Sequence, residues 1–192
     1  MTKMGFFYNQ AACIGCKTCQ IACKDKNALD LGMLFRRVTH YQVGRYPTAR
    51  TYSFAATCNH CEEPACVEIC PNEAMYASES DGTVQHDSRR CIGCQYCVNA
   101  CPYGVPQYSA EEGLVCKCDA CIQLRANGEQ PACVAACPMR ALEFGPVDEL
   151  RAAHPDAVSD IAILPSSEMT HPCTLIAPRA VALDEGFEQV WL

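Results

Sequence analysis

Sixteen of the 18 cysteines in this chain fall into four groups of four, and three of the groups are followed directly by proline. The first and third groups place two, two and three residues between successive cysteines, the spacing that holds cubane iron–sulfur clusters. The second and fourth groups lengthen the middle gap to four and to eleven residues. The groups are Cys13, Cys16, Cys19 and Cys23; Cys58, Cys61, Cys66 and Cys70; Cys91, Cys94, Cys97 and Cys101; and Cys118, Cys121, Cys133 and Cys137. Four such groups in one short chain predict a relay for electrons.

The order of the groups predicts how they share clusters. In a two-cluster ferredoxin, the fourth cysteine of each run ligates the cluster of the other run. The two middle groups can exchange their fourth cysteines locally, and the two outer groups must then close around them. The predicted ligand sets are Cys13, Cys16, Cys19 and Cys137 for cluster 1; Cys118, Cys121, Cys133 and Cys23 for cluster 2; Cys91, Cys94, Cys97 and Cys70 for cluster 3; and Cys58, Cys61, Cys66 and Cys101 for cluster 4. One ferredoxin unit is therefore expected to be nested within another.

Two other uses of cysteine fit the sequence less well. Zinc sites prefer two pairs of ligands separated by a spacer, and cysteines two residues apart make poor disulfide partners. A disulfide-rich secreted chain would also carry an export signal, and the first ten residues hold neither a sustained apolar run nor twin arginines. We therefore favour iron–sulfur clusters over zinc and over disulfides.

Charge and hydropathy narrow the possible partners. The net charge is -7 and only 19% of residues are charged, so simple electrostatics predict no nucleic-acid partner. No stretch approaches the roughly 20 apolar residues that span a bilayer, so we expect no direct membrane span. Six cationic residues near the cysteines either compensate the charge of ligated clusters or are solvated surface charges, and two of them, Arg89 and Arg90, either raise the potential of a neighbouring cluster or contact a partner. The six are Lys17, Lys24, Lys26, Arg89, Arg90 and Lys117.

The residues between the cysteines predict sharp turns and short helices. Gly15 and Gly93 fill the first gap of their groups, where glycine lets the backbone approach a cluster and adopt positive φ. Residues 20–23 and 98–101 are predicted to form short helical turns, which a proline after the fourth cysteine would end. The first group lacks that proline, so its helix is expected to continue towards Asp30.

Alternating and turn-forming residues predict an α+β fold, a duplicated bacterial-type ferredoxin with an irregular C-terminal tail. The expected strands are 34–41, 51–56, 83–86 and 141–144, and the expected helix is 147–153. The proline-studded segment after this helix is expected to have little core of its own and to lie along a partner. The predicted segments are residues 1–24 with 102–145 (outer unit), 25–57 (connecting hairpin), 58–101 (inner unit) and 146–192 (extended tail contacting a partner subunit).

Five stretches of the sequence resemble the iron–sulfur subunit of the dimethyl sulfoxide reductase family of molybdopterin oxidoreductases. They are CIGCKTC at 13–19, FRRV at 35–38, CNHCEEPAC at 58–66, CPYGVPQY at 101–108 and RALEFGPVDEL at 140–150. The cysteine pattern is shared by four-cluster subunits in general, whereas FGPVDEL narrows the resemblance to the dimethyl sulfoxide reductase branch. Some relatives replace the second cysteine of the third group with an aromatic residue. Here that residue is Cys94, so four 4Fe-4S clusters are expected.

The resemblance implies a non-catalytic electron-transfer subunit with two partners. One partner is a catalytic subunit that carries molybdenum bound to two pterins, and the other is a membrane anchor subunit that oxidises quinol. By family similarity, clusters 1 and 2 would face the molybdenum subunit, and clusters 3 and 4 would face the membrane. The resemblance also implies a peripheral place in a membrane-associated complex, on the extracytoplasmic face through co-export with the catalytic subunit, or alternatively in the cytoplasm.

The sequence leaves other partners open. Similar subunits serve polysulfide, thiosulfate and tetrathionate reductases, formate dehydrogenases and transhydroxylases. Formate dehydrogenase types often add a C-terminal membrane helix, which we do not find in this sequence. A free-standing polyferredoxin is a further alternative, and the long segment after residue 145 argues against it.

Cys116 and Cys173 fall outside the four groups, and His60 has two interpretations. Cys116 competes with Cys118 as a ligand, but Cys118 keeps the two-residue gap of its group. Cys173 is expected to be a small apolar packing residue. His60, which lies between two predicted ligands, either hydrogen-bonds to cluster sulfur or packs on Pro64.

Overall fold

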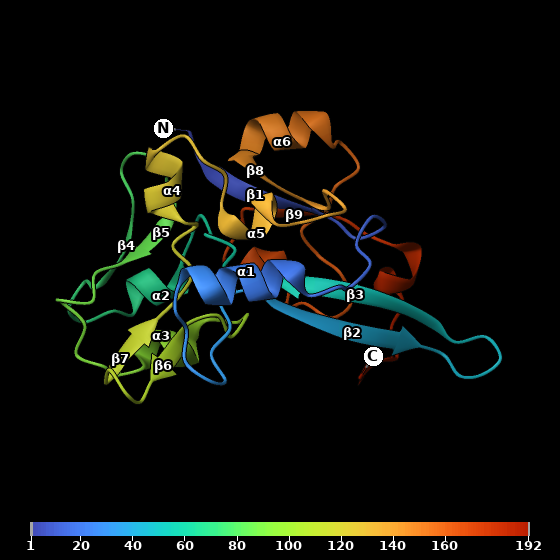
Figure 1. The fold of residues 1–192 in the computed structure, drawn as a ribbon, viewed down its shortest axis with the longest axis horizontal. Helices are drawn as coiled ribbons and strands as arrows, with labels where there is room; N and C mark the ends of the chain where they lie inside the picture. Colours follow the sequence, from blue (N-terminus) through green and yellow to red (C-terminus); the bar gives the residue numbers. More distant parts are fainter. Residues whose placement is uncertain (1, 192) are drawn as a thin grey trace.

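A computed structural model describes residues 2–191, so residues 1 and 192, at the ends of the first and last predicted segments, lie outside it. The described residues combine short helices with four small sheets (Figure 1), which agrees with the predicted α+β class. The helices are α1 (Thr18–Lys26), α2 (Ala65–Glu68), α3 (Tyr96–Ala100), α4 (Ile122–Ala126), α5 (Ala132–Ala135) and α6 (Val147–Ala153). The strands are β1 (Met4–Asn9), β2 (Arg37–Val43), β3 (Arg50–Ala56), β4 (Met75–Ala77), β5 (Val84–His86), β6 (Gln107–Ser109), β7 (Leu114–Cys116), β8 (Leu142–Pro146), β9 (Thr174–Ala177) and β10 (Phe187–Val190).

The first strand, β1, lies at the centre of a three-stranded sheet, between β8 and β9. It pairs antiparallel with β8, where Met4 is opposite Pro146, and parallel with β9. Phe6, Phe7 and Tyr8 are buried in succession because both faces of this sheet are covered. Phe6 and Tyr8 pack with cysteines of the outer groups, whereas Phe7 packs on the opposite face. The sheet thus forms one wall of the cysteine-rich interior.

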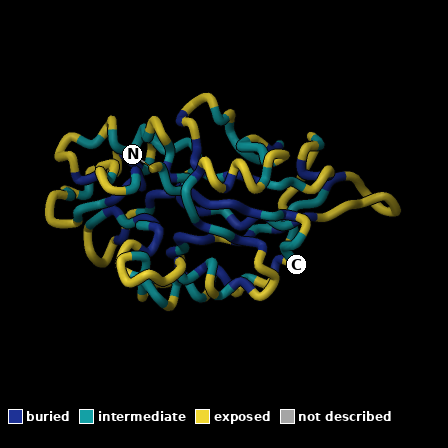
Figure 2. Tube along the Cα trace, turned by 90° about the horizontal axis from the view of Figure 1, so that it is seen from above, coloured by how far each residue is buried: buried dark blue, intermediate teal, exposed yellow. Residues whose placement is uncertain are grey.

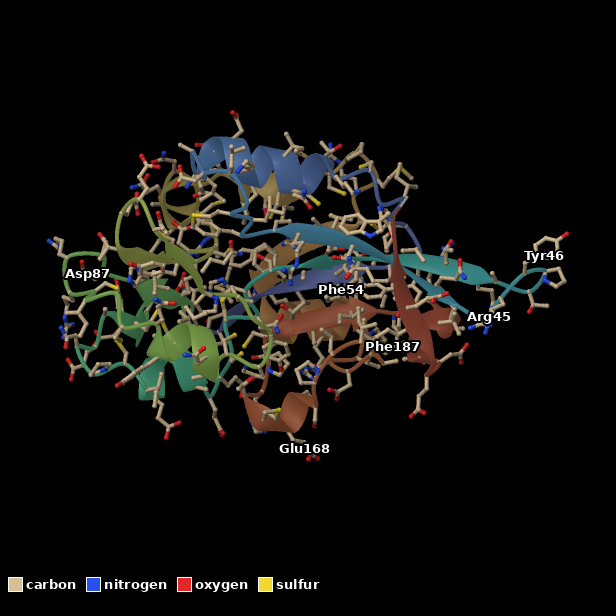
Figure 3. The ribbon with its side chains drawn as sticks, turned by 90° about the horizontal axis from the view of Figure 1, so that it is seen from below. Arg45, Tyr46, Phe54, Asp87, Glu168 and Phe187 are labelled. Atoms are coloured by element: carbon tan, nitrogen blue, oxygen red, sulfur yellow. The ribbon has the colours of Figure 1, made fainter. Side chains whose placement is uncertain are left out.

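The strands β2 and β3 form a long hairpin, and β10 adds a third strand to it. The pairing of β2 with β3 starts with Arg37 opposite Ala56. The hairpin extends away from the body of the molecule, and its tip is exposed (Figures 1 and 2). Figure 3 shows Arg45 and Tyr46 at this tip and Asp87 at the opposite end of the molecule.

Short helices from different cysteine groups meet in pairs. The helix α2 packs against α3, and α1 packs against α5. α2 and α3 belong to the second and third cysteine groups, while α1 and α5 belong to the first and fourth. Two short hairpins, β4–β5 and β6–β7, accompany the α2–α3 pair on the left of Figure 1. The two middle groups therefore meet each other, and so do the two outer groups.

The segment from residue 146 onward, predicted as an extended tail, packs against strands from the first part of the chain. The strands β9 and β10 join two different sheets, and the side chains of Cys173, Leu175, Ile176 and Ala182 are buried. Prolines interrupt the apolar residues of this segment. These apolar residues gain a core only by pairing with β1 and β2, which come from the other end of the sequence.

The helix α1 continues past Cys23, as expected, and ends at Lys26. Ala28 then adopts a φ of 47°, which turns the chain. The Nζ of Lys24 donates to the carbonyl oxygens of Leu29 and Asp30 and stabilises the turn. Across residues 2–191, we find no helix with the length and apolarity that crossing a membrane requires.

Candidate cluster-binding sites

The loops of the first and third cysteine groups have the same backbone geometry. Gly15 and Lys17 adopt φ values of 70° and 62°, and Gly93 and Gln95 adopt 68° and 62°. The backbone N–H of each glycine donates to the sulfur of the first cysteine in its group, at 3.4 Å in both cases. Successive N–H groups that point inward in this way form a concave surface that favours anions.

The fourth cysteines of the second and fourth groups also receive backbone hydrogen bonds. In both groups the chain turns after the Cys-Pro pair, through a residue with φ near 50°. The next residue then donates its N–H to the cysteine sulfur. The donors and acceptors are Ala74 N–H to Cys70 Sγ at 3.2 Å and Ala141 N–H to Cys137 Sγ at 3.3 Å.

Two of the predicted ligand sets each line a single cavity. The first cavity is lined by Cys13, Cys16, Cys19 and Cys137, together with Tyr8, Val38 and Leu142. The second is lined by Cys70, Cys91, Cys94 and Cys97, together with Met75, Tyr96 and Val115. We call these site 1 and site 3. Each contains three cysteines of one group and the fourth cysteine of another.

The other two sets also gather in the interior. Burial, together with the neighbouring thiols of Cys118, Cys133 and Cys121, raises the pKa of Cys23 to about 12. Burial likewise raises the pKa of Cys66 to about 12, with contributions from its neighbours. These neighbours are Cys58, Cys101 and Cys61. We call the set around Cys23 site 2 and the set around Cys66 site 4.

The donors in these sites fit iron–sulfur clusters. Each site offers four thiols, and sites 1 to 3 also offer backbone N–H groups that point at sulfur, which stabilise thiolates. Burial raises the pKa of Cys19 and Cys97 to about 11, so free thiols here would stay protonated at neutral pH. Binding to iron would therefore release protons as the ligands become thiolates.

Comparison with known proteins gives the family. A family model described as "4Fe-4S dicluster domain" matches residues 49–147, and one described as "4Fe-4S binding domain" matches residues 10–27. The sequence is 45% identical over 193 residues to the B subunit of anaerobic dimethyl sulfoxide reductase of Escherichia coli (strain K12), covering 96% of this chain and 93% of that protein. It is 41% identical over 195 residues to the corresponding subunit of Haemophilus influenzae, covering 97% and 94%. This protein belongs to the iron–sulfur subunits of the dimethyl sulfoxide reductase family. It is also 40% identical over 157 residues to the thiosulfate reductase electron transfer subunit PhsB of Salmonella typhi, covering 74% and 75%.

One arginine is fully enclosed in the interior of this iron–sulfur subunit. Arg36 is only 2% exposed, and its guanidinium lies 4.9 Å from the centre of the Phe6 ring. It donates to the carbonyl oxygen of Ala55 at 2.8 Å and to the sulfur of Cys133 at 3.4 Å. Its Nε has no partner in the described structure. Burial opposes its charge, but the thiols of Cys133 and Cys19 outweigh that effect and raise its pKa.

A lysine and a histidine are buried together between the inner and outer cysteines. The Nζ of Lys117 donates to the carbonyl oxygens of Val84 and Cys118, the latter at 2.6 Å. His60 is fully buried, and its Nδ1 accepts the N–H of Val84 at 3.0 Å. In the neutral ring this leaves the proton on Nε2, which lies 4.0 Å from the sulfur of Cys118. The ring therefore points at a cysteine of site 2, although His60 lies in the loop of site 4.

The two cysteines outside the groups line neither the cavity of site 1 nor that of site 3. Cys116 donates a weak hydrogen bond to a carboxylate oxygen of Glu112 at 3.4 Å and lines a polar cavity with Asp30 and Lys117. Cys173 is completely buried, as expected of a packing residue. Among the cationic residues, Arg89 and Arg90 lie on the surface.

Sequence reasoning missed the importance of Arg36. It was part of a matching stretch, but a charged residue is ordinarily expected at the surface. The available signal was its place in a segment of strand-forming residues between two cysteine groups.

Proposed function

We propose that this chain is the electron-transfer subunit of a dimethyl sulfoxide reductase-type complex and holds four 4Fe-4S clusters at sites 1 to 4. When bound, the clusters would supply one-electron carriers between a quinol-linked membrane subunit and a molybdenum bis-pterin catalytic subunit. The observation that carries the proposal is that two of the predicted ligand sets each line one cavity, in a protein whose relatives are subunits of dimethyl sulfoxide reductase. The cysteines of the other two sets are buried neighbours of one another, which supports the same assignment. The residues of this subunit hold and orient the carriers; they make and break no substrate bonds.

The neighbouring cysteines support one order of the sites along the molecule, 1–2–4–3. The neighbouring thiol of Cys133 in site 2 contributes to the raised pKa of Cys19 in site 1. The thiol of Cys118 in site 2 likewise contributes to the raised pKa of Cys58 in site 4. Sites 4 and 3 adjoin through the packed pair α2 and α3. Site 1 and site 3 are thus proposed as the two ends of the relay.

Exposure of the ligands agrees with this order. Cys16 of site 1 and Cys94 of site 3 are exposed, whereas Cys118 and Cys58 are buried. An apolar residue stands next to each exposed end, since Ile14 and Ile92 fill the first gaps of their groups and both are exposed. Exposed apolar residues beside a terminal site are suited to contact with another subunit.

The nested arrangement of two ferredoxin units is part of the same proposal. It is supported by the packing of α1 on α5 and of α2 on α3. We place the outer unit, with sites 1 and 2, towards the molybdenum subunit, and the inner unit, with sites 3 and 4, towards the membrane subunit. We place the complex at the extracytoplasmic face of the membrane, reached by co-export with the catalytic subunit, with the cytoplasmic face as the alternative.

Cys94→Ser tests the serial arrangement, because Cys94 belongs to the proposed terminal site on the quinol side. We expect turnover driven by quinol to fall to background in the intact complex. Turnover driven by a reduced dye that reacts at the molybdenum subunit should remain. Cys116→Ser is the matched control, since Cys116 does not line the cavity of site 3, and both activities should survive in it. Normal quinol-driven turnover in Cys94→Ser would show that site 3 is not in series.

A second substrate class is supported by one observation. The subunit from thiosulfate reductase shares 40% identity over 74% of this chain. Identification of the catalytic subunit that co-purifies with this protein separates the two, because the substrate is chosen on that partner. A thiosulfate-reducing partner would replace the proposed substrate and leave the electron-transfer role intact.

A further inference from the structure

Arg36 and Lys117 are buried cations without a carboxylate partner. Neither forms an ion pair within residues 2–191, where the ion pairs involve other residues. Both side chains are less than a tenth exposed. A buried charge without a counter-ion is strongly destabilising. These two residues are therefore stable inside the protein only if something else nearby carries negative charge.

The nearby groups that can carry it are cysteine sulfurs. Arg36 donates to Cys133 Sγ at 3.4 Å. Lys117 donates hydrogen bonds to the carbonyl oxygens of Cys118 and Val84. The N–H of Val84 in turn donates to His60, so Val84 connects the two side chains. Burial raises the pKa of Cys58 and of Cys118, and the Lys117 charge partly offsets this rise. For Arg36 the counter-charge is thus the ligated thiolates and the clusters that they hold. Lys117 also lines a cavity with Asp30, Glu112 and Asp119, so those carboxylates share with the thiolates the compensation of its charge.

The positions of the two cations coincide with the two inner junctions of the proposed order. The charge of Arg36 opposes the rise in the pKa of Cys19 of site 1, and its guanidinium donates to the sulfur of Cys133 of site 2. The Nζ of Lys117 donates to the carbonyl oxygen of Cys118 of site 2, and the charge of Lys117 opposes the rise in the pKa of Cys58 of site 4. Site 2 is therefore flanked by both cations, and sites 1 and 4 by one each.

Site 3 has no comparable cation among the residues that the structure describes. The cationic side chains close to its cysteines are Arg89 and Arg90, which lie at the surface. Arg89 pairs with Asp87 at 2.9 Å and Arg90 pairs with Glu73 at 2.7 Å. Their charges are therefore compensated and screened by solvent.

We propose that Arg36 and Lys117 determine the reduction potentials along the relay, raising those of sites 1, 2 and 4 relative to site 3. Adding an electron to a site adds negative charge, and a buried cation stabilises that reduced state more than a solvated one does. This inference rests on the proposed function, because it requires clusters at the four sites. It assigns the two residues a role in positioning charge rather than in ligation.

The test is a redox titration of the anaerobically purified complex, followed by electron paramagnetic resonance, with Arg36→Met and Lys117→Met. We expect Arg36→Met to lower the one-electron reduction constant of sites 1 and 2 by about tenfold, which corresponds to about 59 mV. Lys117→Met should lower the constants of sites 2 and 4 by a similar factor. Site 3 should be unchanged in both variants.

Charge-retaining variants provide the control for a purely structural role. Arg36→Lys and Lys117→Arg keep a cation at each place, so we expect their potentials to stay near those of the wild type. Arg90→Gln removes an exposed, paired charge and should leave all four potentials in place. A shift in Arg36→Lys as large as that in Arg36→Met would overturn the charge argument, as would unchanged potentials in both methionine variants.

Iron content separates this inference from the proposed function. Wild-type complex without iron on this subunit would refute the proposed function itself. Iron-replete variants with unshifted potentials would refute only the role of the cations. If Arg36→Met fails to retain iron at sites 1 and 2, the test rests on Lys117→Met. The inference then requires a lower reduction potential at site 4 and an unchanged potential at site 3.

Discussion

A substitution at Gly93 tests the loop geometry of the sites most sharply. Gly93 adopts a φ of 68°, and its N–H donates to Cys91 Sγ at 3.4 Å. A Cβ at this position would overlap the carbonyl oxygen of Gly113 and lie 3.5 Å from the ring of Tyr108. Since the overlapping atom belongs to the backbone, it cannot rotate away. Gly93→Ala must therefore distort either the cysteine loop or the turn that carries Gly113.

Two costs add in Gly93→Ala. An L-residue in the left-handed region costs about 1–2 kcal/mol, and overfilling a packed position costs about 1–3 kcal/mol. Together they amount to about 2–5 kcal/mol, which lowers the equilibrium constant for forming the native loop roughly 30-fold to 3,000-fold. Gly113→Ala is the matched control, because Gly113 has a φ of 67° and open space around its Cβ position. It carries only the cost of the left-handed backbone.

The assay is iron per subunit together with the signal of each cluster in the reduced complex. We expect Gly93→Ala to lose most of the cluster at site 3 and to retain about twelve of about sixteen irons, at four per cubane. Gly113→Ala should keep nearly all of its iron. Equal iron content and equal stability in the two variants would refute the proposed dependence of site 3 on this loop.

Two further predictions concern stability. Burial alone would raise the pKa of Asp81, but hydrogen bonds from Thr83 and Arg125 outweigh it and lower the pKa to about 2. Asp81 therefore stabilises the native state above its usual pKa, and this contribution is lost as pH falls from about 4 to 2. Allowing for solvent screening, we expect Asp81→Asn to cost about 1–2 kcal/mol at pH 7, with the same cost at pH 6 and pH 8, measured by anaerobic denaturant unfolding. A variant as stable as the wild type would contradict this role of the Asp81–Arg125 pair, which spans 2.6 Å. Iron removal by a chelator should leave the protein largely unfolded, because cluster binding and folding are linked, and a native-like circular dichroism spectrum afterwards would refute that linkage.

Local sequence patterns predicted several elements well. The predicted helix 147–153 matches α6, and the predicted strands 83–86 and 141–144 overlap β5 and β8. These succeed because turn residues and alternation are local signals. The predicted hairpin arms overlap β2 and β3, with ends that differ by a few residues.

Features that depend on distant contacts were not predictable from one sequence. The burial of Leu175 and Ile176 arises from parallel pairing of β9 with β1, from the opposite end of the sequence. Arg36 is likewise buried only because the outer cysteines and Phe6 surround it. Spacing predicted which cysteines belong to a group, and the assignment of ligand sets and segment boundaries remains a prediction.

Metal and spin quantification on the anaerobically purified complex tests the central claim most directly. The measurement is the iron content of this subunit and the number of reducible clusters, with identification of the co-purifying subunits. We predict about sixteen irons, four reducible 4Fe-4S clusters and a large molybdenum-containing partner. A colourless zinc protein would contradict the iron–sulfur assignment, and a brown protein that purifies alone would contradict the proposed place in a reductase complex.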